Sequence, residues 1–246
     1  MDEHASPTHA TRTDTPSPLR RGVDRGPRPI LRGRLHENAA WYFAGTGTAL
    51  AVTAAVLHGM SLLTGVTVLY VLCLIGMLTV SALYHRAPWP TTGAVAAWRR
   101  ADHSMIAVFI AGTYGPIAVN AFDSVRDGLW ILPVCWIAAG VAVGVNIAWI
   151  GHPRWLDVVI YLIIGWLAVL KIGDFATGTP LTAGILIVVG GLIYTAGAVI
   201  YGLQRPTISE RWFGFHELFH AATIVAAWNN SWKPNQRSEI VGRWSP

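Results

Sequence analysis

Seven long apolar stretches, separated by short polar gaps, constrain this chain more than any other feature. They cover residues 39–58, 66–84, 101–122, 129–150, 155–172, 181–203 and 212–232. A helix needs about 20 apolar residues to cross ~30 Å of hydrocarbon. Because lipid offers no partner to an unpaired backbone amide, each stretch should be helical. The sequence therefore predicts an all-α, polytopic membrane protein with a bundle of seven transmembrane helices.

The composition outside these stretches divides the chain into three parts. Only 13% of the residues are charged, about half the roughly 25% of an ordinary soluble domain, which excludes a soluble fold. Residues 1–34 are rich in Pro, Thr, Ser and Arg and are predicted to be a disordered, basic tail. Residues 35–232 form the membrane domain, and residues 233–246 form a second short tail.

The distribution of Lys and Arg predicts the orientation in the membrane. With the N-terminus inside, 13 of the 18 basic residues fall on the cytoplasmic side. The positive-inside rule therefore predicts a cytoplasmic N-terminus and, for seven spans, an extracytoplasmic C-terminus. We expect a multi-pass protein of the plasma (inner) membrane. The arginines just before the first stretch are interpreted as its cytoplasmic anchor, and nucleic acid is not an expected partner.

Polar residues that should be rare at membrane depth gather at one end of the predicted bundle. The second span runs toward the cytoplasm, whereas the third and seventh run away from it. Their ionisable groups therefore meet just inside the inner leaflet, and such groups usually serve a function. The residues concerned are Ser81, His85, Asp102, His216 and His220.

These residue types suit a catalytic zinc site. His216 and His220 are four residues apart and share one helix face, and His85 supplies a third imidazole. Three nitrogen ligands with one open position are typical of catalytic Zn²⁺, which lowers the pKa of bound water to about 7. Asp102 would act on that water as a general base or orient it. Ser81 would contact the same water or the substrate carbonyl.

Other interpretations of the histidines stay open. HELFH also matches the H-E-x-x-H motif of zinc proteases. Intramembrane zinc proteases need a further acidic metal ligand downstream, and the only acidic residue after His220 is Glu239, in the outer tail. Glu217 is therefore predicted to be a helix-face partner and not a proteolytic base. A haem site would leave Asp102 and Ser81 without a role. Four further histidines near helix ends are interpreted as interfacial side chains: His36, His58, His103 and His152.

The same residues carry a resemblance to a known family. The matching strings are Glu37-Asn38, SALYH, RRADHSMIAVFIAGTYGP, GGLIYTAGAVIY and HELFH, in this order. The sequence resembles the haemolysin III family, within the progestin and adipoQ receptor group that includes the adiponectin receptors. The resemblance covers about residues 35–230, the whole predicted membrane region.

This resemblance implies a fold and a site. It implies seven helices with the N-terminus inside, and zinc held by His85, His216 and His220. It also implies that Asp102 hydrogen-bonds the zinc-bound water and that Ser81 belongs to the same site. Related families hydrolyse ceramide-type amides. One departure is that many relatives carry another histidine late in the seventh helix, where this chain has Asn229 and Asn230.

Together these observations favour a zinc-dependent hydrolase that acts on a lipid amide or ester. Membrane lipids would be the substrate or ligand and would enter laterally between helices. One alternative is a pore-forming cytolysin, which should show polar stripes through several helices. The other alternative is a membrane-state sensor or receptor in which zinc is structural.

Overall fold

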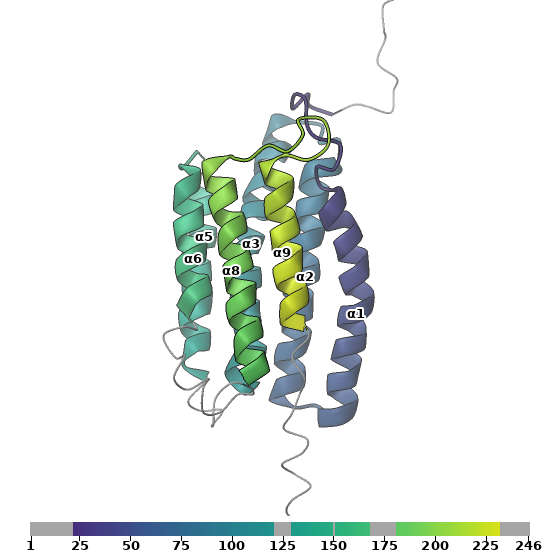
Figure 1. Ribbon diagram of the computed structural model, residues 1–246, viewed down its shortest axis with the longest axis vertical. Helices are drawn as coiled ribbons and strands as arrows, with labels where there is room; N and C mark the ends of the chain where they lie inside the picture. Colours follow the sequence, from purple (N-terminus) through teal and green to yellow (C-terminus); the bar gives the residue numbers. More distant parts are fainter. Residues whose placement is uncertain (1–21, 121–128, 150, 168–180, 232–246) are drawn as a thin grey trace, which may run out of the picture.

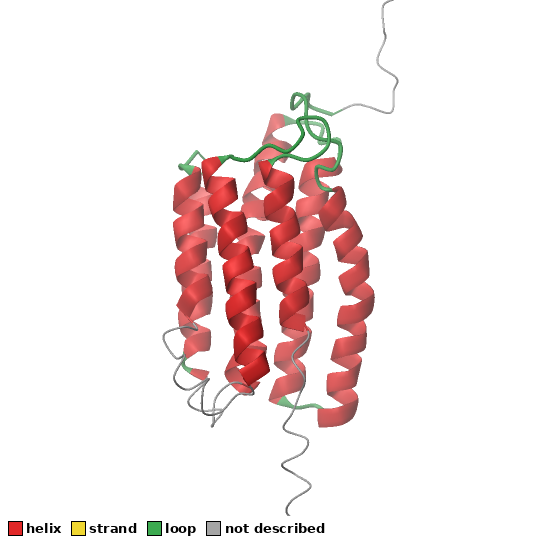
Figure 2. Ribbon diagram, viewed as in Figure 1, coloured by secondary structure: helices red, strands yellow, loops and turns green. Residues whose placement is uncertain are grey.

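The chain is described here from a computed structural model, which covers residues 22–120, 129–149, 151–167 and 181–231. Seven α-helices account for most of these residues, and the described residues contain no β-strand (Figures 1 and 2). The helices are α1 (Arg34–His58), α2 (Leu62–Arg86), α3 (Thr92–Asn120), α5 (Ile131–Ala148), α6 (Arg154–Trp166), α8 (Leu181–Leu203) and α9 (Phe215–Ser231). The all-helical prediction is confirmed, with one helix on each predicted stretch.

Within the described residues, four helices are long and apolar enough to cross a membrane: α1, α2, α5 and the Gly184–Leu203 part of α8. The fifth predicted stretch coincides with α6, which has 13 described residues. The remainder of that stretch, residues 168–172, lies outside the described part of the chain. The coordinates thus support a membrane protein with several apolar helices, and the full set of seven spans remains a prediction.

The helices stand side by side along the long axis of the molecule (Figure 1). Each packs on its neighbours in chain order, α1 also contacts α9, and α3 reaches α6. Small residues allow the closest approaches: a Cβ on Gly112 would lie 2.9 Å from Cys73, and one on Gly197 would lie 2.6 Å from Ala222. Small residues at such contacts let membrane helices pack by van der Waals contact where lipid supplies no hydrophobic drive.

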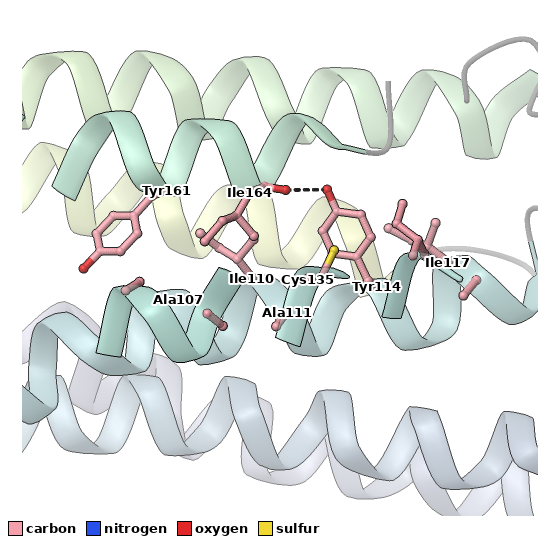
Figure 3. Packing of buried hydrophobic residues seen from close by; sticks show 12 residues of the cluster. Ala107, Ile110, Ala111, Tyr114, Ile117, Cys135, Tyr161 and Ile164 are labelled. Carbon is pink, nitrogen blue, oxygen red and sulfur yellow. Dashed lines mark hydrogen bonds between the residues drawn. The ribbon is translucent and has the colours of Figure 1, made fainter. Parts of the chain in front are cut away.

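One core cluster joins α3, α5 and α6 (Figure 3). Tyr114 belongs to this cluster and is 1% exposed. Its hydroxyl donates to the carbonyl oxygen of Ile164 at 2.7 Å, near the end of α6. A buried tyrosine normally finds such a partner, and this bond fixes α6 against α3.

Local caps place the helix ends. Ser61 precedes α2, and its hydroxyl accepts a hydrogen bond from the backbone N–H of Thr64, which satisfies one otherwise unpaired donor.

Because successive helices run in opposite directions, α2 ends where α3 and α9 begin, at the top of Figure 1. We call this the ligand end of the bundle. It carries all five residues of the predicted site.

The segment before α1 departs from the disordered tail predicted through residue 34. Residues 22–33 lie across the ligand end, with backbone hydrogen bonds from Val23 to Trp89 and from Ile30 to Arg211, both at 2.9 Å. The composition predicts disorder because the segment has few apolar side chains. In the structure, residues 22–33 are held in place by hydrogen bonds to the segments next to the helix ends. Residues 1–21 and 232–246 lie outside the described residues.

Candidate metal centre

Three histidines from two helices converge at the ligand end. His85 lies in the last turn of α2, while His216 and His220 lie on one face of the first turns of α9. One ring nitrogen from each lies within 4.8 Å of the others, and Nε2 of His85 is 3.1 Å from Nε2 of His216. His85 and His220 are buried. This is the only group of this kind found among the described residues.

The donor set fits a transition-metal ion. Three imidazoles in an enclosed site suit Zn²⁺, Cu²⁺, Fe²⁺ or Ni²⁺ rather than Mg²⁺ or Ca²⁺, which prefer oxygen. Nε2 of His85 and Nε2 of His216 face each other at 3.1 Å in a buried site. A cation shared by the three rings would bind to the lone pairs of ring nitrogens that face one another.

Asp102 and Ser81 lie beside the three histidines. Oδ2 of Asp102 is 3.7 Å from Nε2 of His85, which is too long for a direct hydrogen bond. A water or a substrate oxygen can bridge groups at such a separation. Ser81, on α2 one turn before His85, is a hydrogen-bonding neighbour of the Asp102 carboxylate. Both side chains are buried, so bulk water does not compete for them.

One cavity adjoins this cluster. Its walls combine the polar residues of the site with apolar side chains from α2, α3, α6, α8 and α9. They include Ser81, Asp102, His216 and His220 together with Met77, Ile106, Ala198 and Phe219, and on another side His103, Asp157 and Tyr161. A ligand bound there would meet several polar side chains together with apolar ones, a combination found in small-molecule sites.

Sequence reasoning missed the role of His36. This histidine was interpreted as interfacial, but it is 2% exposed. Its ring stacks on that of His220, with centroids 3.7 Å apart and planes 9° from parallel. Neither ring nitrogen has a hydrogen-bond partner. Nothing in its sequence position, one residue before Glu37, indicates this stacking, because it depends on how α1 meets α9.

Sequence reasoning also missed a second polar network, between α3, α5 and α6. Asp157 is buried and its Oδ2 lies 3.1 Å from Nδ1 of His103. The hydroxyl of Tyr161 donates to the backbone carbonyl of His103 at 2.7 Å, and His152 lies 3.2 Å from the side-chain oxygen of Asn146. His103 and His152 thus have side-chain partners within the bundle, which their interpretation as interfacial side chains did not predict. Asp157, an acidic residue inside the fifth apolar stretch, was the feature of the sequence that could have indicated this network.

Glu217, the acidic residue of HELFH, has partners on both of its carboxylate oxygens. Glu217 is the third residue of α9, and its Oε2 accepts from the backbone N–H of Gly214 at 2.8 Å. This is half of a capping box. Its other oxygen is paired with Arg32. Both carboxylate oxygens thus have partners outside the three imidazoles, which agrees with the predicted role as a helix-face partner.

Comparison with known proteins gives one family and several distant relatives. A family model described as haemolysin-III related matches residues 26–230. A hemolysin-3 homolog of Bacillus subtilis (strain 168) is 27% identical over 115 residues, which are 46% of this chain and 54% of that protein. A hemolysin-3 of Bacillus cereus is 26% identical over 155 residues, which are 63% of this chain and 64% of that protein. The matches thus span between about half and two thirds of these relatives.

Proposed function

Because the chain belongs to the haemolysin-III related family, we propose that it is a membrane hydrolase that cleaves a lipid amide or ester at a zinc site near the cytoplasmic leaflet. The observation that carries this proposal is the convergence of His85, His216 and His220 within 4.8 Å of one another, with the buried carboxylate of Asp102 beside them. Three imidazoles with a carboxylate next to them are the donor set expected of a catalytic zinc site and not of a closed structural one.

The chemistry follows from the placement of each group. His85, His216 and His220 would hold zinc, which supplies Lewis-acid polarisation of a carbonyl and activation of a water molecule. Asp102 accepts the proton that the attacking water loses. As the bond from the carbonyl carbon to nitrogen or oxygen breaks, Asp102 returns that proton to the leaving group. Ser81 orients the Asp102 carboxylate or the substrate carbonyl, and the burial of both side chains keeps bulk water out.

A lipid substrate agrees with the position of the site. The ligand end lies where polar groups meet the ends of apolar helices, and the adjoining cavity is bounded by Met77, Ile106 and Phe219. A scissile amide or ester next to the headgroup of a lipid sits at this depth. Its acyl chain would remain among apolar side chains, so entry between helices from the bilayer is the expected route.

The proposed topology gives a direct prediction. A reporter fused after Pro246 should behave as extracytoplasmic, because 13 of 18 basic residues then lie inside. Alkaline phosphatase should be active in this fusion and green fluorescent protein dark, with a fusion at the N-terminus as the opposite control. Fluorescence from the C-terminal fusion would contradict the orientation and place the metal centre at the outer leaflet.

Hydrolysis can be tested on the purified full-length protein. The protein is reconstituted in liposomes that contain either a fluorescent short-chain ceramide or a fluorescent diacylglycerol. We expect release of the fluorescent fatty acid from one of them, loss of release after chelation, and recovery with Zn²⁺. Metal binding without any product from a wider lipid panel would favour a sensor with structural zinc. Conductance in planar bilayers that survives His216→Ala would favour a pore-forming cytolysin, the activity suggested by the name of the relatives.

A further inference from the structure

We propose that residues 25–33, together with His36, form a positioning element of the metal centre that holds the ends of α2 and α9 at the spacing at which His85, His216 and His220 share one cation. We call residues 25–33 the strap. The inference depends on the metal centre of the proposed function but not on hydrolysis, because it concerns how tightly the metal is held.

One half of the strap caps the end of α2. Nη1 of Arg25 donates to the carbonyl of Tyr84 at 2.6 Å, and its guanidinium lies 4.4 Å from the centroid of the Tyr84 ring. Nη1 of Arg28 donates to the carbonyl of His85 at 3.3 Å. The last carbonyls of a helix lack partners within the helix, and positive charge is favoured there. Two arginines therefore fix the turn that carries the ligand His85.

Arg28 retains its charge in this position. Partial burial, with a smaller contribution from the neighbouring Arg25, lowers the pKa of Arg28 from its ordinary value. A guanidinium nevertheless stays protonated in proteins. The strap therefore presents fixed positive charge to the carbonyl end of α2.

The other half of the strap holds the start of α9. The backbone N–H of Ile30 donates to the carbonyl of Arg211 at 2.9 Å, and that of Leu31 donates to Trp212 at 3.4 Å. Arg32 pairs with Glu217, which lies between the two α9 ligands in sequence. The strap is thus tied to the segment that leads into α9 and to its first turn.

Gly33 brings the strap directly against a ligand. Its φ is 77°, a left-handed conformation that favours glycine. A Cβ built on Gly33 would lie 2.7 Å from the Cβ of His85 and 3.0 Å from Arg86. Any side chain here would either change the path of the strap or displace His85. The backbone conformation and the close approach both require glycine.

His36 extends the same element to the third ligand. It lies three residues after Gly33, in the first turn of α1, and its ring is stacked on His220 at 3.7 Å. The stack restricts the rotation of the His220 ring about its side-chain bonds. Neighbours that fix the orientation of a ligand ring in this way raise metal affinity.

The helices themselves do little to fix this spacing. In the described part of the chain, α2 packs mainly on α1 and α3, whereas α9 packs mainly on α8. Besides the contact of His85 with His216 itself, a side-chain link between α2 and α9 runs from the Tyr70 hydroxyl to the carbonyl of Ala227 at 3.4 Å, about four turns away from His85 along α2. At the ligand end, the strap therefore bridges the two helices that supply the three imidazoles.

The test measures metal affinity of the full-length protein in detergent, by competition for Zn²⁺ with a chromophoric chelator. Gly33→Ala, Arg32→Ala and His36→Ala should each weaken binding about 10- to 100-fold, the range for groups that orient ligands. His36→Phe keeps a flat ring on His220 and should restore most of the affinity. The matched control is Arg86→Ala, because Arg86 pairs with Glu37 at the same end but is exposed.

The outcomes separate this inference from the proposed function. If the wild-type protein binds no metal, the metal centre itself is wrong and the inference falls with it. If the wild-type protein binds metal and folded strap variants stay within about twofold of it, like Arg86→Ala, the inference alone is overturned. Gly33→Ala and His36→Ala leave the Arg32–Glu217 pair intact, so they decide the question if Arg32→Ala does not fold. A His36→Phe variant as weak as His36→Ala would contradict the role of stacking.

Discussion

Asp102→Ala should retain the bound metal and lose turnover by a factor of about 10² to 10⁴, the usual contribution of a positioned general acid–base group. The three imidazoles do not need Asp102 to bind a cation, because its Oδ2 is 3.7 Å from the nearest of their nitrogens. Of the carboxylates described near the cluster, Asp157 is paired with His103 and Glu217 with Arg32, so Asp102 is the one assigned to the proton transfers of hydrolysis. Metal content and initial rates on the responsive lipid probe are measured on the same preparation.

The control for this variant is Ser104→Ala. Ser104 is also buried on α3 and lies outside the cavity lining, so its loss should leave the rate within a few-fold of wild type. Unchanged turnover in Asp102→Ala would remove Asp102 from the reaction. Loss of metal together with turnover would make Asp102 part of the coordination sphere instead.

Glu217→Gln should destabilise the protein by about 3–5 kcal/mol, the cost of leaving one member of a buried ion pair alone. Glu217 is 1% exposed and Arg32 is 20% exposed. Glutamine keeps an oxygen that can accept from the Gly214 N–H, so the change isolates the ion pair from the cap. Denaturant unfolding of the detergent-solubilised protein, followed by circular dichroism, measures the difference.

The matched control is Glu37→Gln. Its partner Arg86 lies at 2.7 Å, but the two side chains are 41% and 36% exposed, and exposed pairs contribute only about 0–1 kcal/mol. A Glu217→Gln protein that is as stable as wild type would contradict the assignment of Arg32 and Glu217 as a stabilising buried ion pair. If that variant also lost all turnover, Glu217 would be a catalytic base, as the H-E-x-x-H motif suggests.

Much of the fold could be predicted from the sequence because lipid imposes a simple rule. Stretches of about 20 apolar residues must become helices, and each of the seven coincides with a helix in the structure. The gathering of His85, Asp102 and His216 at one end was also predictable. Successive membrane helices run in opposite directions, so the end of one helix lies beside the start of the next. A polar residue at the end of the second helix and polar residues at the start of the third and seventh must therefore lie on the same side of the membrane.

The remaining features depend on tertiary contacts that no local pattern encodes. The strap resembles a disordered tail in composition, yet its arginines find the unpaired carbonyls at the end of α2. His36 is buried because α1 crosses the start of α9, and Asp157 is buried because His103 and Tyr161 lie beside it. A single sequence shows which helices form, whereas the partners of individual polar side chains depend on how those helices are rotated.

The central claim is that one metal ion is held by His85, His216 and His220, and elemental analysis of the purified protein tests it most directly. The account predicts about one zinc per chain in wild type and its loss in both His216→Ala and His220→Ala, with His58→Ala as a control outside the cluster. Full retention of zinc in both variants, or a folded wild-type protein without any transition metal, would contradict it.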